Sequence, residues 1–134
     1  MTPAYVGDWT LARTITDLDA DRELACRGTA SLRDVAGALS YAENVHYRLA
    51  GKTIRATRAY CFRLIGTTIV ANFAAGTPFF TLDLTADGTG SAIHQCGADR
   101  YELTLRLTAP SVWETRWDVT GAKRLTIETC YTRA

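Results

Sequence analysis

The stretch that decides the fold is LSYAENVHYRLAGKTIRATRAYCFRL, residues 39–64. Apolar and aromatic side chains alternate with polar ones up to Leu49, and the alternation resumes after the tight turn signal Ala50-Gly51-Lys52. A period of two predicts a strand with one inward face, and a short glycine turn between two such runs predicts a hairpin. With the turn centred at Gly51, antiparallel register places Glu43 opposite Arg58.

The same rhythm continues in both directions along the chain. From Asp8 to Arg133 the sequence reads as roughly ten short alternating segments, each closed by a turn signal such as Gly37, Gly66 or Asp87-Gly88. No segment keeps a 3.6-residue period, so long helices are not expected. Because closure removes exposed strand edges, we expect an all-β protein, an antiparallel up-and-down β-barrel of about 8–10 strands. A two-sheet sandwich is the alternative.

Length and composition indicate one globular domain, residues 1–134. The chain has 134 residues, of which 47% are hydrophobic and 22% charged, and a domain of this size can bury a core. The net charge is +1 with no basic run, so neither nucleic acid nor an anionic membrane is an expected partner. The sequence leaves open whether the protein is a monomer or a homodimer.

The compartment follows from the N-terminus and the cysteines. Residues 1–8 show no basic region followed by an apolar stretch, so a signal peptide is not expected and the protein is expected to be cytoplasmic. In that compartment cysteines are reduced thiols. This expectation covers Cys26, Cys61, Cys96 and Cys130.

The sequence resembles the calycin superfamily, which includes lipocalins and fatty-acid-binding proteins. Gly7-Asp8-Trp9 looks like the lipocalin Gly-x-Trp signature, and Arg133 would suit the arginine that packs on that tryptophan. Tyr131-Thr132-Arg133 holds, in reversed order, the tyrosine and arginine of the last strand of fatty-acid-binding proteins. The chain is also similar to small bacterial lipocalin-like proteins of unknown function, through Phe79 to Leu84, His94-x-Cys96-x-x-Asp99-x-Tyr101, Trp113 with Trp117, and Tyr131. The resemblance implies a barrel that holds a ligand inside, with Trp9 plugging its closed end.

Two charged residues fall on the predicted inward face. Glu43 lies between Tyr41 and Val45, where an unpartnered carboxyl should have a raised pKa and can act as a general acid or base. Arg58 lies beside Tyr60 and can hold a ligand carboxylate or enolate through its guanidinium fork. The alternatives are a structural ion pair between Glu43 and Arg58, or placement of Glu43 at the mouth of the barrel.

His94 and Cys96 share a face two residues apart. Two ligands do not make a zinc site, so no metal is expected. The pair can be a buried thiol beside a hydrogen-bonded histidine, a nucleophilic pair, or a site where His94 shuttles protons. No phosphate-binding loop, dinucleotide fingerprint or nucleophile elbow is present, so no cofactor is expected.

Aromatic residues dominate the inward faces. A core built only for packing favours aliphatic residues, whereas a cavity walled by rings with polar tips is typical of a small-molecule site. The predicted ligand-binding residues are Tyr41, Tyr47, Tyr60, Phe80, Tyr101, Trp113, Trp117 and Tyr131.

Two functions of different class follow from these residues. The first is a cofactor-independent cyclase or isomerase of secondary metabolism. It would act on a hydrophobic aromatic or polyketide-like substrate, with Glu43, His94 and Arg58 as catalytic residues. The second is a non-catalytic carrier or sensor of a similar ligand. A purely structural protein would have no cavity.

Overall fold

The structure, a computed structural model, describes residues 3–134 and is a ten-stranded antiparallel β-barrel. A short 3-10 helix, η1 (Pro3–Tyr5), precedes the strands. The strands are β1 (Gly7–Asp17), β2 (Arg22–Val35), β3 (Ala38–Leu49), β4 (Lys52–Ile65), β5 (Thr68–Phe73), β6 (Pro78–Asp83), β7 (Thr89–Cys96), β8 (Asp99–Ala109), β9 (Val112–Thr120) and β10 (Leu125–Arg133). The predicted fold class is therefore confirmed.

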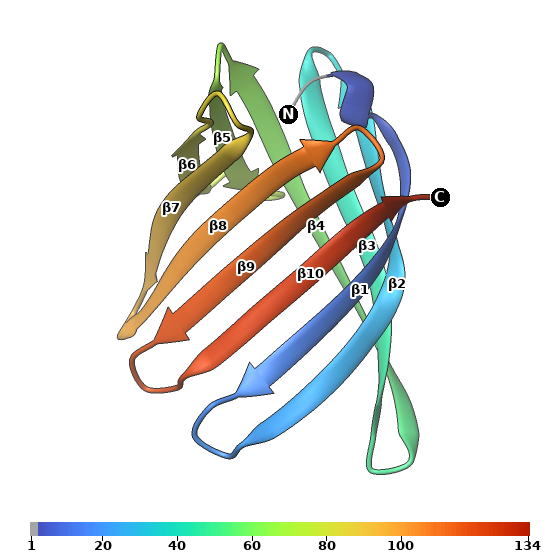
Figure 1. Ribbon diagram of the computed structural model, residues 1–134, viewed down its shortest axis with the longest axis vertical. Coiled ribbons are helices and arrows are strands. Elements are labelled where there is room, and N and C mark those ends of the chain that lie inside the picture. Colours follow the sequence, from blue (N-terminus) through green and yellow to red (C-terminus); the bar gives the residue numbers. More distant parts are fainter. Residues whose placement is uncertain (1–2) are drawn as a thin grey trace.

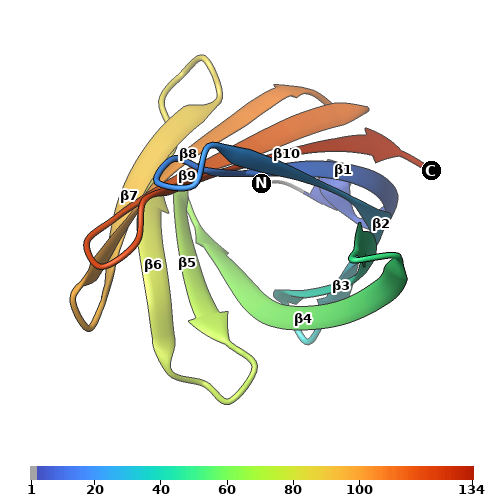
Figure 2. The ribbon, with the colours of Figure 1, turned by 90° about the horizontal axis from the view of Figure 1, so that it is seen from below.

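All ten strands belong to one sheet that curls upon itself. Their order is β6-β5-β4-β3-β2-β1-β10-β9-β8-β7, so neighbours in sequence pair, except for β6 and β7, and β1 pairs with β10. Figure 1 shows the tilted strands from the side, and Figure 2 shows them from below, arranged around the barrel axis. Because all strands form a single curled sheet, the alternative of a two-sheet sandwich is wrong.

The barrel closes without a hydrogen-bonded ladder where β6 meets β7, the two ends of the sheet. Contact between these strands depends on Gly90 of β7, where an added Cβ would lie 2.7 Å from the carbonyl oxygen of Asp83 of β6. The short connection is tied by a hydrogen bond from the amide of Thr85 to the carbonyl of Thr89. We call this boundary between the two strands the β6–β7 seam.

The hairpin of β3 and β4 has the predicted register. Ala50 and Gly51 both have positive φ angles, 51° and 77°, as a two-residue hairpin turn that follows the strand twist requires. Glu43 pairs with Arg58 across the two strands, as the sequence predicts. The inward face of β3 thus carries Tyr41 and Glu43 toward the barrel interior.

One end of the barrel is sealed around Trp9. The indole is fully buried, stacks near Tyr5 at 6.1 Å between ring centroids, and donates from Nε1 to the Tyr5 carbonyl at 3.0 Å. The Arg133 guanidinium lies 4.0 Å from the centroid of the Trp9 ring and donates to the carbonyls of Ala4, Val6 and Pro110. The packing of Arg133 on Trp9 that the calycin resemblance implies is therefore present.

Several inward-facing side chains beyond this sealed end are only half-buried. Leu11 and Trp113 are buried near Trp9, whereas Ile15 and Trp117, further along the same faces of β1 and β9, are half-buried. Burying one large apolar side chain contributes roughly 1.5–3 kcal/mol, so the sealed end holds much of the core's stabilisation. The other half of the interior is free to be a cavity.

Candidate functional site

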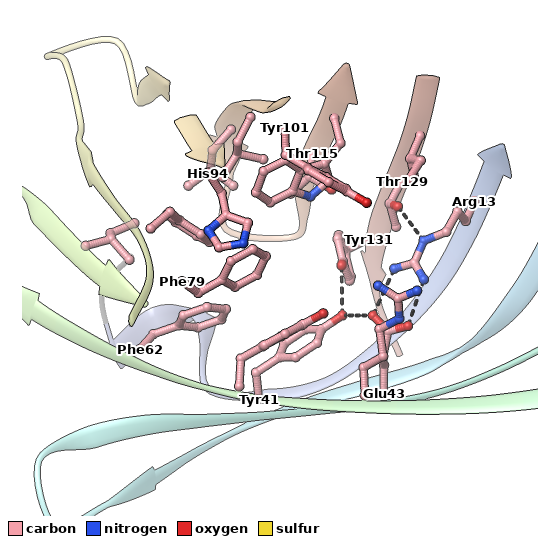
Figure 3. Close-up of a pocket in the computed structure, with 18 of the residues that line it drawn as sticks. Arg13, Tyr41, Glu43, Phe62, Phe79, His94, Tyr101, Thr115, Thr129 and Tyr131 are labelled. Atoms are coloured by element: carbon pink, nitrogen blue, oxygen red, sulfur yellow. Dashed lines mark hydrogen bonds and ion pairs between the residues drawn. The ribbon is translucent and has the colours of Figure 1, made fainter. Parts of the chain in front are cut away.

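The interior holds a cavity of about 310 Å³. Every strand except β2 contributes to its wall, and the lining is aromatic and aliphatic with a few polar groups. The lining residues are Arg13, Ile15, Tyr41, Glu43, Arg58, Tyr60, Phe62, Ile69, Phe73, Phe79, Phe80, His94, Cys96, Tyr101, Leu103, Leu105, Trp113, Thr115, Trp117, Ile127, Thr129 and Tyr131. Figure 3 shows the charged side chains on one side of this space and His94 with Phe79 on the other.

A polar network from β1, β3 and β10 forms the charged side. Arg13 donates two hydrogen bonds to the Glu43 carboxylate, 2.7 Å from Nη1 to Oε2 and 2.8 Å from Nη2 to Oε1, and a third from Nε to Thr129 Oγ1 at 2.8 Å. Tyr41 donates to Glu43 Oε1 at 2.6 Å. The Tyr41 and Tyr131 hydroxyl oxygens are 2.8 Å apart, and since Tyr41 uses its proton on Glu43, Tyr131 is the donor.

This network sets the protonation of its members. Burial raises the pKa of Glu43, but the hydrogen bonds and charge of Arg13 outweigh it, so the pKa of Glu43 lies below its ordinary value. Burial also raises the pKa of Tyr131 to about 12 and that of Tyr41 well above its ordinary value, which the negative charge of Glu43 reinforces. At neutral pH the carboxylate is therefore ionised and both phenols are neutral.

The partner of Glu43 is the main correction to the sequence prediction. The raised pKa predicted for an unpartnered Glu43 is wrong, and so is the alternative of an ion pair with Arg58, because Arg13 reaches from β1 over the neighbouring strand β2 and takes both carboxylate oxygens. Arg13 has the same strand phase as Leu11 and Ile15, an inward position for an arginine. That signal was in the sequence, but the contact of Arg13 with Glu43, over the strand β2 that lies between β1 and β3, was not.

Arg58 lines the cavity without entering this network. It is exposed, and it forms no ion pair with a carboxylate of the residues described. Burial lowers the pKa of Arg58, while the hydrogen bond to Tyr60 and the charge of Glu43 outweigh it and raise the pKa. The Arg58 guanidinium is thus a cation at the cavity, and no carboxylate of the described residues lies within ion-pair distance of it.

Aromatic rings from four strands form the opposite wall, which we call the aromatic wall. The ring centroids of Tyr60 and Phe79 are 5.1 Å apart, and those of Phe73 and Phe79 are 4.5 Å apart. Phe79 stacks on Trp117 with the ring centroids 5.4 Å apart and the planes 10° from parallel. Phe80 meets Trp117 edge-on at 5.8 Å. The wall therefore presents flat, rigid faces to the cavity.

His94 and Cys96 lie on β7, at the seam. The His94 side chain is half-buried. Its ring centroid lies 5.1 Å from that of Phe79 and 6.1 Å from that of Tyr101. Cys96 is exposed, so the alternative of a buried thiol beside the histidine does not describe it. Cys61 and Cys130 are half-buried, Cys26 is buried, and all four thiols are free.

The structure brings most of the predicted site residues to one cavity. Ten of the eleven are in its lining, and Tyr47 is the exception: it is half-buried and pairs with Cys26 and Ile54, beyond Glu43 toward the β3–β4 turn. Trp113 stacks on Tyr131 with the centroids 3.6 Å apart, and its Nε1 is buried without a hydrogen-bond partner among the described residues. Arg13, Phe79, Thr115 and Thr129 are lining residues that the sequence prediction missed.

Two further findings concern the described residues 3–134. They contain no cluster of three or more His, Cys, Asp or Glu side chains placed to hold a metal ion. None of their helices has the length and apolar character needed to cross a membrane.

Comparison with known proteins places the chain in a family. The model of a family of unknown function, DUF6314, matches residues 5–133, so the chain belongs to that family. No curated protein matches the sequence.

Solved structures share the fold at low sequence identity. The S-type phycobiliprotein lyase CPES from Guillardia theta matches with a TM-score of 0.73 and 10% identity, over 98% of this chain and 89% of the lyase. A protein of unknown function from the DUF3598 family of Nostoc punctiforme matches with a TM-score of 0.69 and 13% identity, over 98% of this chain and 48% of its own, so this chain spans about half of it. A de novo designed fluorescence-activating β-barrel matches with a TM-score of 0.50 and 13% identity over the whole of both chains.

Proposed function

We propose that this DUF6314 protein binds a small hydrophobic molecule, aromatic or polyketide-like, inside its barrel. The observation that carries the proposal is the cavity of about 310 Å³, with the aromatic wall on one side and the Arg13–Glu43 network on the other. Small-molecule pockets are typically about 300–1,000 Å³, mostly apolar, with a few fixed polar groups.

The side chains of the wall favour a ligand over packing alone. Tyr60, Tyr101 and Trp117 are half-buried around the space, and their polar tips can serve a ligand as well as water. The network of Arg13, Glu43 and Tyr41 is satisfied internally, which holds that side of the cavity in one geometry. A preformed cavity binds a rigid molecule with little loss of side-chain entropy.

The structural neighbours support the proposal at the level of the fold. One is a phycobiliprotein lyase and another is a designed fluorescence-activating barrel, and we take from them that this architecture suits a molecule held in the interior. Because the identities are 10% and 13%, the ligand is argued from this chain's own residues.

Binding is favoured over catalysis by Glu43. A carboxylate that accepts two bonds from Arg13 and one from Tyr41 is a weak base and is not protonated to act as an acid. Its role in this proposal is to position Arg13 and Tyr41. We therefore place the carrier or sensor first.

A cofactor-independent cyclase or isomerase is the second candidate, and His94 is the observation that favours it. The imidazole sits against Phe79 and Tyr101 at the cavity, where it can exchange a proton with a bound substrate. Molecules extracted from purified wild-type protein and from His94→Asn distinguish the two. If the protein is an enzyme, His94→Asn should retain unconverted substrate, which differs from the molecule extracted from wild type by mass spectrometry or chromatography. If the protein is a carrier, both proteins should retain the same molecule.

The binding proposal is tested with the neutral fluorophore N-phenyl-1-naphthylamine. We expect saturable binding to the wild-type protein, with energy transfer from tryptophan. Binding should be lost in Thr115→Trp, because the introduced indole fills the cavity. The matched control is Thr57→Trp, on the exposed face of β4. Absence of binding to wild type, or equal binding to both variants when circular dichroism shows both folded, would contradict the proposal.

A further inference from the structure

We infer that Arg58 binds the anionic group of the ligand, so that the cavity selects aromatic monoanions over neutral molecules of the same shape. The inference rests on the proposed function and names the chemical class of its ligand. It follows from the charges of the lining, the position of Arg58 and the geometry of the aromatic wall.

The charged lining is not balanced. Two guanidinium groups, those of Arg13 and Arg58, and one carboxylate, that of Glu43, face the cavity. Both oxygens of the carboxylate are taken by Arg13 at 2.7 and 2.8 Å. Arg58 therefore remains as the cation in excess, and among the described residues it forms no ion pair.

The position of Arg58 allows solvent to compensate its charge until a ligand arrives. The side chain is exposed, so water solvates the guanidinium in the unliganded protein. A hydrophobic molecule that fills the cavity displaces part of this water, and a neutral molecule would leave the charge without a partner. A carboxylate, sulfonate or phenolate replaces the lost water with charge-assisted hydrogen bonds to the guanidinium fork.

The same placement orients the ring system of the ligand. Arg58 and Tyr60 are two residues apart on β4 and point to the same face, and Tyr60 contacts Phe79, which stacks on Trp117. An anion held at Arg58 thus has its aromatic body directed along Tyr60 toward the aromatic wall. Arg58 fixes one end of the molecule and the rings fix the other.

The lining also limits the ligand's charge. A cation would face two guanidinium groups with only one carboxylate between them. A second anionic group would have to compete with Glu43 for Arg13, whose fork is already engaged. The lining has one positive charge in excess, so it matches a ligand with a single negative charge.

The test uses two probes with the same ring system. 1-Anilinonaphthalene-8-sulfonate carries one negative charge, and N-phenyl-1-naphthylamine is its uncharged counterpart. Dissociation constants are measured for wild type, Arg58→Gln, and the control Arg55→Gln, which alters an exposed arginine on the opposite face of the same strand. Charge-assisted hydrogen bonds contribute about 1.5–3 kcal/mol, so Arg58→Gln should weaken sulfonate binding by roughly 10-fold or more.

We expect Arg58→Gln to strengthen binding of the neutral probe or leave it unchanged, because the neutral probe no longer removes water from an unpartnered charge, and Arg55→Gln to leave both probes unchanged. Salt should weaken binding of the sulfonate to wild type and have little effect in Arg58→Gln. If the neutral probe binds but Arg58→Gln affects both probes equally, or neither, the inference is overturned while the proposed function stands. If neither probe binds the wild-type barrel, both are overturned.

Discussion

Separating Arg13 from Glu43 should destabilise the barrel more than any single change at its exposed face. The Glu43 side chain is 2% exposed and that of Arg13 11%, and two charge-assisted bonds join them. Removing one partner of a buried ion pair typically costs roughly 3–5 kcal/mol, because the other charge is left uncompensated. A domain is stable by only about 5–15 kcal/mol, so either single variant loses a large part of its stability.

The two single variants should differ in a way that the contacts determine. In Glu43→Gln the amide oxygen still accepts from Tyr41, and Arg13 keeps Thr129 as a partner, so the cost lies near the lower limit. In Arg13→Met the carboxylate keeps only Tyr41 in an apolar environment, so the cost lies near the upper limit at neutral pH. That cost should shrink in acid, because a carboxyl without its counter-charge has a raised pKa and becomes neutral.

Urea denaturation of the two single variants and the double variant measures the coupling. We expect the double variant to recover about 2–3 kcal/mol relative to the sum of the single losses, near the upper limit for groups in contact. Arg58→Met is the matched control, and since Arg58 is exposed and unpaired with any described carboxylate, it should cost no more than about 0.5 kcal/mol. Strictly additive losses, or an Arg58→Met loss as large as that of Arg13→Met, would refute this reasoning.

Three other predictions concern acid stability, the seam and the tryptophans. The pKa of Glu43 in the folded protein lies below its ordinary value of 4.5, so its contribution to stability is complete above pH 4.5 and is lost as the pH falls through the folded pKa. The free energy of unfolding in urea should therefore fall less steeply with acid in Glu43→Gln than in wild type. Gly90→Val places a side chain against Asp83 and should accelerate amide exchange in β6 and β7, and unchanged exchange would argue against a close seam. A bound ligand should change tryptophan emission in Trp9→Phe but much less in Trp117→Phe, and the reverse would misplace the cavity.

The fold was predictable because its determinants are local. Alternation with period two set the strands, and the Ala50-Gly51 turn set the register that places Glu43 opposite Arg58. Short antiparallel connections then left few topologies to consider. Even the sealing of Trp9 by Arg133 was implied by the resemblance to calycins.

The polar partners were not predictable, because they depend on how far each side chain reaches over the neighbouring strands. Strand phase shows that Arg13 and Glu43 both face inward, but it does not show that the Arg13 side chain on β1 extends over β2 to the Glu43 carboxylate on β3, 2.7 Å from Nη1 to Oε2. Tyr47 illustrates the converse: its phase is inward, yet it lies too far toward the β3–β4 turn to reach the cavity. Phase assigns a face, whereas position along the barrel axis decides which inward residues share a site.

The most direct test of the central claim is a crystal structure of the protein with N-phenyl-1-naphthylamine bound. The account predicts that the ring system lies inside the barrel, against Phe79, Tyr60 and Trp117, with the Arg13–Glu43 bonds intact. A probe bound only to the outer surface, with the interior closed by the rings of the aromatic wall, would contradict it.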